Sequence, residues 1–141
     1  MSLQDELDIT PLKKALETLK KGVSFYKNGL NLYNEEMIEG LIDMCIQRFE
    51  YTLESSIKFM RKILIKEYNQ SNGVLTMTNT FRFMQDYGFI KNWENWDNYY
   101  KNRNKSVHEY SFEKSRSAFD IIPNFIEDVD YLIKNIEERL K

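Results

Sequence analysis

Apolar residues recur every three or four positions along most of the chain, which is the period of an amphipathic helix. The longest such stripe runs from Ile38 to Tyr68 and covers about nine turns. Shorter stripes lie within residues 12–26, 81–87 and 119–140. No alternating pattern is long enough to indicate a strand. The chain is therefore predicted to be all-α, an up-and-down antiparallel bundle of about five helices of the kind built with short connections.

Capping residues indicate where the first two helices begin and end. Thr10-Pro11 predicts a start in which the Thr hydroxyl caps free N–H groups and Pro takes the first helical position. Asn34 is expected to cap the long second helix, and the polar run 69–73 is expected to end it. Two prolines and five glycines in 141 residues favour long helices joined by short turns.

The second half of the chain has its own boundary signals. The run Thr78-Asn79-Thr80 predicts the start of a third helix, which Gly88 stops, and Asn92 is expected to open a fourth. A final helix is expected to begin at Ser111 and Glu113. Pro123 lies inside its apolar stripe and predicts a kink, because proline removes a backbone donor and clashes with the preceding turn.

Composition limits the class of protein. The length fits one domain, residues 1–141, and 42% hydrophobic residues indicate a globular chain. A single cysteine, Cys45, excludes a disulfide within the chain and favours the cytoplasm, and no apolar run reaches the roughly 20 residues that span a bilayer. The net charge of −2 offers no general attraction for nucleic acid, so RNA binding would require a local basic patch.

Several kinds of chemistry have no signature in the sequence. There is no glycine-rich phosphate loop, and one His with one Cys does not make a usual zinc site. The acidic residues show no paired spacing that suggests a metal site. The Gly-Ser pair followed by a spaced Asp couple, which marks nucleotidyltransferases, is also missing. We expect no metal and no cofactor, and the chain is not itself a nucleotidyltransferase.

The polar segment WDNYYKNRNKSVHEY, residues 96–110, holds the one histidine of the chain. His108 can take or give a proton near neutral pH, and Arg103 presents a planar fork that fits phosphate oxygens. Together they form a minimal set for metal-independent RNA cleavage, with His moving a proton and Arg stabilising charge on phosphorus. Lys101, Lys105 and Trp96 are the accompanying candidates for binding.

The spacing of this motif has a geometric consequence. On an unbroken helix Arg103 and His108 differ by about 140° and share no face, whereas Asn104 lies one turn before His108 and can orient its imidazole. Arg103 and His108 act together only if the helix breaks or two subunits contribute to one groove. The plainer alternative makes the histidine a surface or capping residue, the two lysines solvated, and Trp96 a core anchor.

At RNKSVHEY the sequence resembles the HEPN superfamily, whose signature is Arg, four to six residues, and His. More closely, IQRFEYTLE at residues 46–54, FRFMQDYGFI at 81–90 and the following Trp96 resemble the family of nucleotidyltransferase substrate-binding proteins over most of the chain. One departure is that Ile57 precedes Lys58 where family members usually carry Trp. This is an apolar exchange that can alter the wall of a pocket.

The resemblance implies a helical bundle that forms homodimers, with the Arg–His motifs along the dimer cleft. It also implies a separate minimal nucleotidyltransferase as partner, encoded nearby. In related toxin–antitoxin pairs the HEPN chain is an RNase toxin, and the partner silences it by attaching AMP to a Tyr two residues after the His. Carried over, catalytic roles fall on Arg103 and His108, a supporting role on Asn104, and the modification on Tyr110.

Three functions compete at this stage. The chain is an RNase toxin restrained by its nucleotidyltransferase, or a non-catalytic subunit that gives that enzyme a nucleotide- or substrate-binding surface, or a helical interaction module whose motif only builds the dimer interface. The presence of Arg, His and Tyr together favours the first, because a purely structural role does not require all three. The acidic balance of the chain counts against strong RNA binding.

Overall fold

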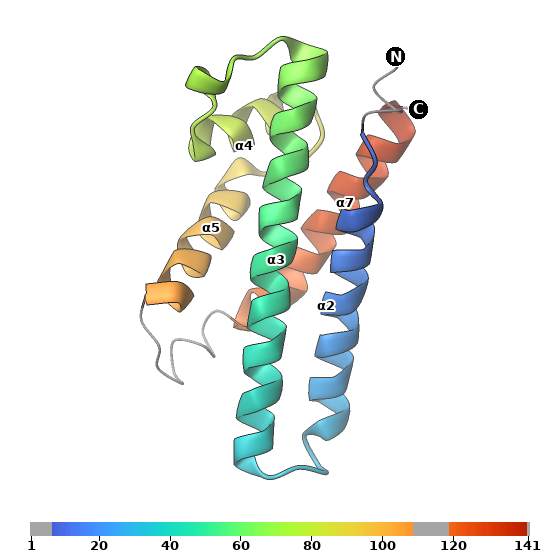
Figure 1. The fold of residues 1–141 in the computed structure, drawn as a ribbon, viewed down its shortest axis with the longest axis vertical. Coiled ribbons are helices and arrows are strands. Elements are labelled where there is room, and N and C mark those ends of the chain that lie inside the picture. Colours follow the sequence, from blue (N-terminus) through green and yellow to red (C-terminus); the bar gives the residue numbers. More distant parts are fainter. Residues whose placement is uncertain (1–6, 109–118, 141) are drawn as a thin grey trace.

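The computed structural model describes residues 7–108 and 119–140, and for residues 104–108 it describes the helical backbone alone (Figure 1). Within these residues there are five α-helices, one short 3-10 helix and no strand. This confirms the predicted all-α class. The elements are α2 Thr10–Gly29, α3 Glu35–Tyr68, η1 Asn72–Val74, α4 Met77–Asp86, α5 Trp93–His108 and α7 Ile122–Arg139.

Four of the helices run alternately up and down (Figure 1). The helices α2 and α3 form a long antiparallel hairpin, α5 runs back along the other side of α3, and α7 returns toward the end of the bundle where α2 begins. The short helix α4 crosses the end of the bundle between α3 and α5. The up-and-down topology expected from the sequence is therefore confirmed.

Asn34 and Asn92 cap the starts of α3 and α5 as the sequence predicts, whereas α4 begins at Met77, earlier than predicted, with Thr76 as its cap. The Asn34 side chain accepts the Met37 N–H at 2.9 Å, and α3 ends at Asn69, whose φ of 55° is left-handed. The predicted cap at Thr10 is wrong. The helix already includes Thr10, and its N–H donates to Asp8 Oδ1 at 3.0 Å, so the carboxylate of Asp8 takes the role that the Thr hydroxyl was expected to fill.

Pro123 does not kink a continuous helix. The helical residues 119–120 are followed by a turn at Ile121, and α7 begins at Ile122 with Pro123 at its second position. A proline is accommodated there because the N–H groups of the first helical turn have no partner within the helix. The predicted kink is thus a helix start, and the predicted start at residues 111–113 lies outside the described residues.

Aromatic rings join three helices at the centre of the core. Phe125 of α7 makes edge contacts with Phe49 of α3 at a centroid distance of 4.8 Å, with Tyr99 of α5 at 5.1 Å, and with Trp96 of α5 at 5.8 Å. Phe49, Trp96 and Phe125 are completely buried. Each edge-to-face pair adds about 0.5–1.5 kcal/mol beyond the burial of its area, so this cluster determines how α5 lies between α3 and α7.

One polar bond reinforces the same junction. The Tyr99 hydroxyl donates to Asp128 Oδ2 of α7, although the tyrosine ring itself is almost completely buried. Burial and the neighbouring Asp128 carboxylate both raise the pKa of Tyr99 far above its ordinary value. The folded chain therefore holds this phenolic proton more tightly than the unfolded chain does.

We expect Tyr99→Phe to lower the free energy of unfolding at pH 7 by about 1–2 kcal/mol, the range for a hydrogen bond to a carboxylate that keeps some contact with water. A raised folded-state pKa gives stability that is complete below the unfolded pKa of about 10 and is lost as the pH rises above it. Urea titrations should show a smaller difference in the free energy of unfolding between wild type and Tyr99→Phe at pH 11 than at pH 7.

Tyr51→Phe is the matched control, because Tyr51 is 59% exposed. Its unfolding free energy should follow the wild type at both pH values. A constant difference between wild type and Tyr99→Phe from pH 7 to pH 11 would contradict the assignment of the proton to this bond.

Candidate functional site

Arg103 of α5 reaches across to α3. Its Nη2 donates to Glu54 Oε1, and 29% of the arginine side chain is exposed against 55% of the glutamate. Arg103 lies one turn beyond Tyr99, on the helix face that the aromatic cluster holds toward its neighbours. The core therefore fixes which way this guanidinium faces.

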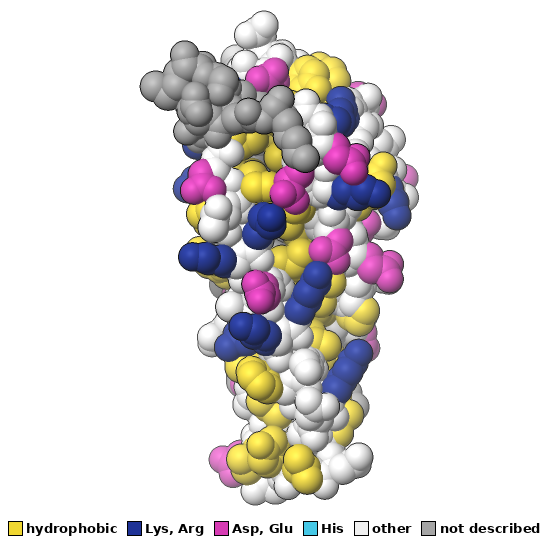
Figure 2. All heavy atoms as spheres, turned by 90° about the vertical axis from the view of Figure 1, so that its right-hand side faces the viewer, with side chains coloured by type: hydrophobic (Ala, Val, Ile, Leu, Met, Phe, Trp, Pro, Cys, Tyr) yellow, Lys and Arg dark blue, Asp and Glu magenta, His cyan; other side chains and the backbone are white. Residues whose placement is uncertain are grey.

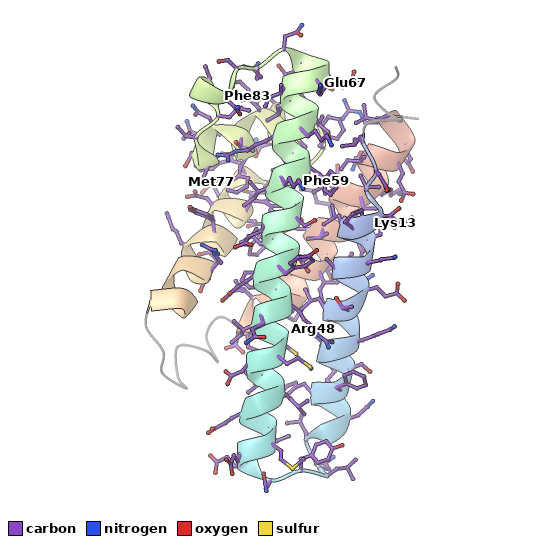
Figure 3. All side chains as sticks on the ribbon, viewed as in Figure 1. Lys13, Arg48, Phe59, Glu67, Met77 and Phe83 are labelled. Atoms are coloured by element: carbon purple, nitrogen blue, oxygen red, sulfur yellow. The ribbon has the colours of Figure 1, made fainter. Side chains whose placement is uncertain are left out.

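Arg103 forms one end of a groove between α3, α4 and α5 with a volume of about 520 Å³. This size lies within the range of about 300–1,000 Å³ that is typical of small-molecule sites. Figure 3 shows Met77 at the start of α4, on the α4–α5 side of α3. The apolar lining consists of Leu53, Ile57, Ile65, Met77 and Tyr100.

The charged lining of the groove is mostly basic. It comprises four cations and one carboxylate, a formal net charge of +3, from Lys58, Arg61, Lys62, Arg103 and Glu54. The whole chain carries −2, so the groove is the kind of local basic patch that RNA binding requires of an acidic chain. Arg61 is held in place, because its Nη2 donates to the Leu75 carbonyl at 2.9 Å.

The backbone of α5 is helical without a break from Arg103 to His108. These two positions therefore differ by about 140° around the helix axis. Of the two arrangements in which they could act together, a break of the helix between them is not observed. The side chains of Asn104, Lys105 and His108 lie outside what the structure describes, as does the whole of Tyr110.

Two other candidate residues have ordinary structural roles. Trp96 was among the expected binding residues, but its side chain is completely buried against Phe81 and Phe125, so it is a core anchor. Lys101 is 70% exposed and pairs with Asp97 one turn earlier at 3.2 Å. Its position is that of a solvated surface lysine, as the plainer interpretation has it.

The sequence interpretation missed the basic wall that α3 contributes. Lys58, Arg61 and Lys62 follow one another at spacings of three and four residues, which place them on one helix face. That spacing was a usable signal. What the sequence did not show was that this face lies beside Arg103, about forty positions further along the chain. Ile57, the departure from the family pattern, lines the same groove and is almost completely buried.

The described residues hold no candidate metal cluster, no thiol with a lowered pKa and no helix that could span a membrane. Among the residues that the structure describes, no group of three His, Cys, Asp or Glu side chains could hold a metal ion. Burial raises the pKa of Cys45 to about 11, which disfavours the reactive thiolate and fits a buried small hydrophobe. None of the described helices is both long and apolar enough to span a bilayer.

Comparisons with known proteins give matches over nearly the whole chain. The family model "Nucleotidyltransferase substrate binding protein like" matches residues 7–138. A curated Haemophilus influenzae protein named "Probable ribonuclease HepT" is 24% identical over 141 residues, which cover 97% of each chain.

Solved structures show the same fold. A Haemophilus influenzae structure, described as having the fold of a substrate binding domain of a nucleotidyltransferase, superposes with a TM-score of 0.84 at 24% identity, covering 92% of this chain and 99% of that one. A Thermus thermophilus structure gives a TM-score of 0.71 at 20% identity, covering 89% and 98%. Because the family model spans nearly the whole chain, the protein belongs to the family of nucleotidyltransferase substrate binding protein-like chains.

Proposed function

We propose that this chain is the HEPN-type helical partner of a minimal nucleotidyltransferase, and that it is the metal-independent RNase half of a toxin–antitoxin pair. The observation that carries the proposal is the position of Arg103. Its guanidinium lies at the edge of a net-positive groove, on the same continuous helix as His108. The curated relative named as a probable ribonuclease supports the same activity.

The proposed reaction needs only groups of the protein and the RNA. The ribose 2′ oxygen attacks the adjacent phosphorus, the P–O bond to the 5′ oxygen breaks, and the 2′ proton leaves as the 5′ oxygen gains one. His108 moves a proton at one of these two oxygens, Arg103 stabilises the charge that develops on the phosphoryl oxygens, and Asn104 orients the imidazole. The products are a 2′,3′-cyclic phosphate and a 5′-hydroxyl end.

The helix geometry supports a composite site built by two subunits. With Arg103 and His108 about 140° apart on a rigid helix, one phosphate reaches both groups if Arg103 comes from one subunit and His108 from another. A two-fold homodimer supplies this arrangement twice, because an isologous interface brings each motif close to its copy. The proposed active species is therefore the dimer.

One observation favours the alternative function, a non-catalytic nucleotide- or substrate-binding subunit of a two-component nucleotidyltransferase. In the described structure the Arg103 guanidinium is already bonded to the Glu54 carboxylate. A guanidinium held in this way has to exchange partners before it contacts a phosphate. Wild-type chain that co-purifies with its nucleotidyltransferase but cleaves no RNA would support this alternative.

His108→Ala should lower the rate of RNA cleavage by about 10²- to 10⁴-fold, the usual effect of losing a proton-transfer group. Arg103→Ala should also abolish measurable cleavage and growth toxicity. Both variants should stay folded, since the Arg103–Glu54 pair is partly exposed and contributes no more than about 1 kcal/mol. Cleavage of labelled RNA with EDTA present, together with circular dichroism, makes the measurement.

The control for these two variants is Lys27→Ala, because Lys27 is exposed and lies near the end of α2. This variant should cleave RNA like the wild type. Full activity in either Arg103→Ala or His108→Ala would rule out the assigned roles. Cleavage that stops on chelation would instead indicate a metal-dependent reaction.

Mixing the two inactive variants tests the composite site. A heterodimer of Arg103→Ala and His108→Ala has one site with both lesions and one site with neither. Random pairing puts half of the dimers in this class, so the mixture should recover about a quarter of wild-type activity. Light scattering of the wild type at micromolar concentration should give the mass of a dimer. No recovery after confirmed subunit exchange would mean that Arg103 and His108 do not complement across subunits, and a monomeric wild type would exclude the composite site.

Tyr110 is the proposed target of the partner enzyme. It follows His108 by two residues, which on a continued helix would place it about 200° around, so a turn of the chain is needed to bring its phenol to the cleft. An attached AMP there would block RNA by bulk and by negative charge. Incubation with the co-purified nucleotidyltransferase and ATP should add the mass of AMP to the wild type and not to Tyr110→Phe. An equal gain in both chains would place the modification elsewhere.

A further inference from the structure

Two hollows of similar size lie on opposite sides of the bundle and differ in how their charges are arranged. The hollow between α2 and α7 has a volume of about 580 Å³, and two of the lysines that line it are bonded across it: Lys13 to Glu137 at 3.2 Å and Lys20 to Asp130 at 3.1 Å. Figure 2 shows this face, where blue and magenta side chains are interspersed. Its three lysines are outnumbered by four carboxylates, a formal net charge of −1 that leaves no net attraction for an anion.

The groove between α3 and α5 has the opposite character. Among the described residues Lys58 and Lys62 form no ion pair, and both line the groove one helical turn apart. Arg61 lies between them in sequence, and its Nε is buried without a hydrogen-bond partner in the described part of the chain. These donors stand beside the Arg103–Glu54 pair, on a wall that carries no other carboxylate.

The apolar part of the same groove has the composition of a base-binding surface. Tyr100 lines it from α5, and Ile57 and Met77 line it from α3 and α4. Unpaired bases bind proteins by stacking on aromatic rings while lysines and arginines follow the backbone. An apolar floor with a row of cations along one edge therefore fits a base and its phosphate together.

We propose that this groove binds one unpaired nucleotide of the substrate RNA, next to the phosphate that is cleaved. The base packs against Tyr100 and the aliphatic floor, and Lys58 and Lys62 hold its phosphate. The proposal rests on the proposed RNase function and adds the class of substrate, single-stranded RNA. Duplex RNA does not fit, because its bases are stacked inside the helix and a pocket of this kind receives only a base that is splayed out.

The experiment uses the full chain with His108→Ala, so that RNA is bound without being cleaved. A fluorescein-labelled single-stranded RNA of mixed sequence is titrated by anisotropy at several salt concentrations. Adding Lys58→Gln and Lys62→Gln should weaken binding by roughly tenfold and reduce the salt slope by about 0.7, the value for one phosphate that is no longer neutralised on a single strand. Tyr100→Leu should weaken binding by roughly tenfold with the salt slope unchanged, because stacking carries no charge.

The matched control is Lys14→Gln with Lys27→Gln, two exposed lysines of α2 whose loss changes the net charge equally. It should bind within twofold of the parent. Thermal melting of every variant confirms that the chains are folded. Equal RNA affinity of this control and of the variant with Lys58→Gln and Lys62→Gln would overturn the proposed role of the groove. Binding of duplex RNA as tightly as single-stranded RNA would also overturn it. Displacement of the RNA by free AMP at micromolar concentration would also overturn it, since the groove would then be a mononucleotide site.

The outcomes separate this proposal from the RNase proposal. If wild-type chain binds single-stranded RNA through Lys58 and Lys62 but never cleaves it, the RNA-binding role of the groove is supported and the catalytic roles of Arg103 and His108 are contradicted. If cleavage depends on Arg103 and His108 while the variants at Lys58, Lys62 and Tyr100 bind RNA normally, the catalytic roles are supported and the RNA-binding role of the groove is contradicted. Wild-type chain that binds no single-stranded RNA overturns the groove.

Discussion

The contact of Phe125 with Phe49, Trp96 and Tyr99 is the constraint on which the candidate site depends. It joins α7, α3 and α5 through rings that are buried from solvent. The rotation of α5 about its own axis is fixed at Trp96 and Tyr99, and Arg103 follows one turn later. The Arg103 guanidinium thus takes its orientation from the hydrophobic core and not from the Glu54 bond, which is partly exposed and contributes little stability by itself.

Charge is distributed unevenly over an almost neutral chain. The α2–α7 face pairs two of its lysines with carboxylates, whereas the α3–α5 groove concentrates cations around a single glutamate. A chain with a net charge of −2 offers no general attraction for RNA, so under the proposed function association rests on contacts within the groove, over distances shorter than the Debye length of about 10 Å. Such a surface favours selective binding of a strand that fits over general attraction for nucleic acid.

Periodicity in the sequence was enough to predict the fold, because apolar residues that recur with a period of 3.6 indicate both that a segment is helical and which face it buries. Boundaries were less accurate where two residues compete for the same role. At the start of α2 the Asp8 carboxylate accepts the Thr10 N–H in place of a cap by the Thr10 hydroxyl, and Pro123 lies at the start of a helix because the chain turns at Ile121. The wall of Lys58, Arg61 and Lys62 was missed for a different reason. These residues of α3 line the groove together with Arg103 of α5, which is distant in sequence. Only the packing of α5 on α3 brings them together.

A continuous α5 couples the proposed chemistry to assembly. Positions 103 and 108 lie about 140° apart on the continuous helix α5, and the proposed function therefore takes Arg103 and His108 at one phosphate from different subunits. Under the proposed function, activity then rises with dimer concentration, and any group that blocks one cleft removes an Arg103 from one subunit and a His108 from the other. Modification of Tyr110, two positions beyond His108, would act at the point where the two subunits meet, so a partner enzyme that reached this residue would control both halves of the site together.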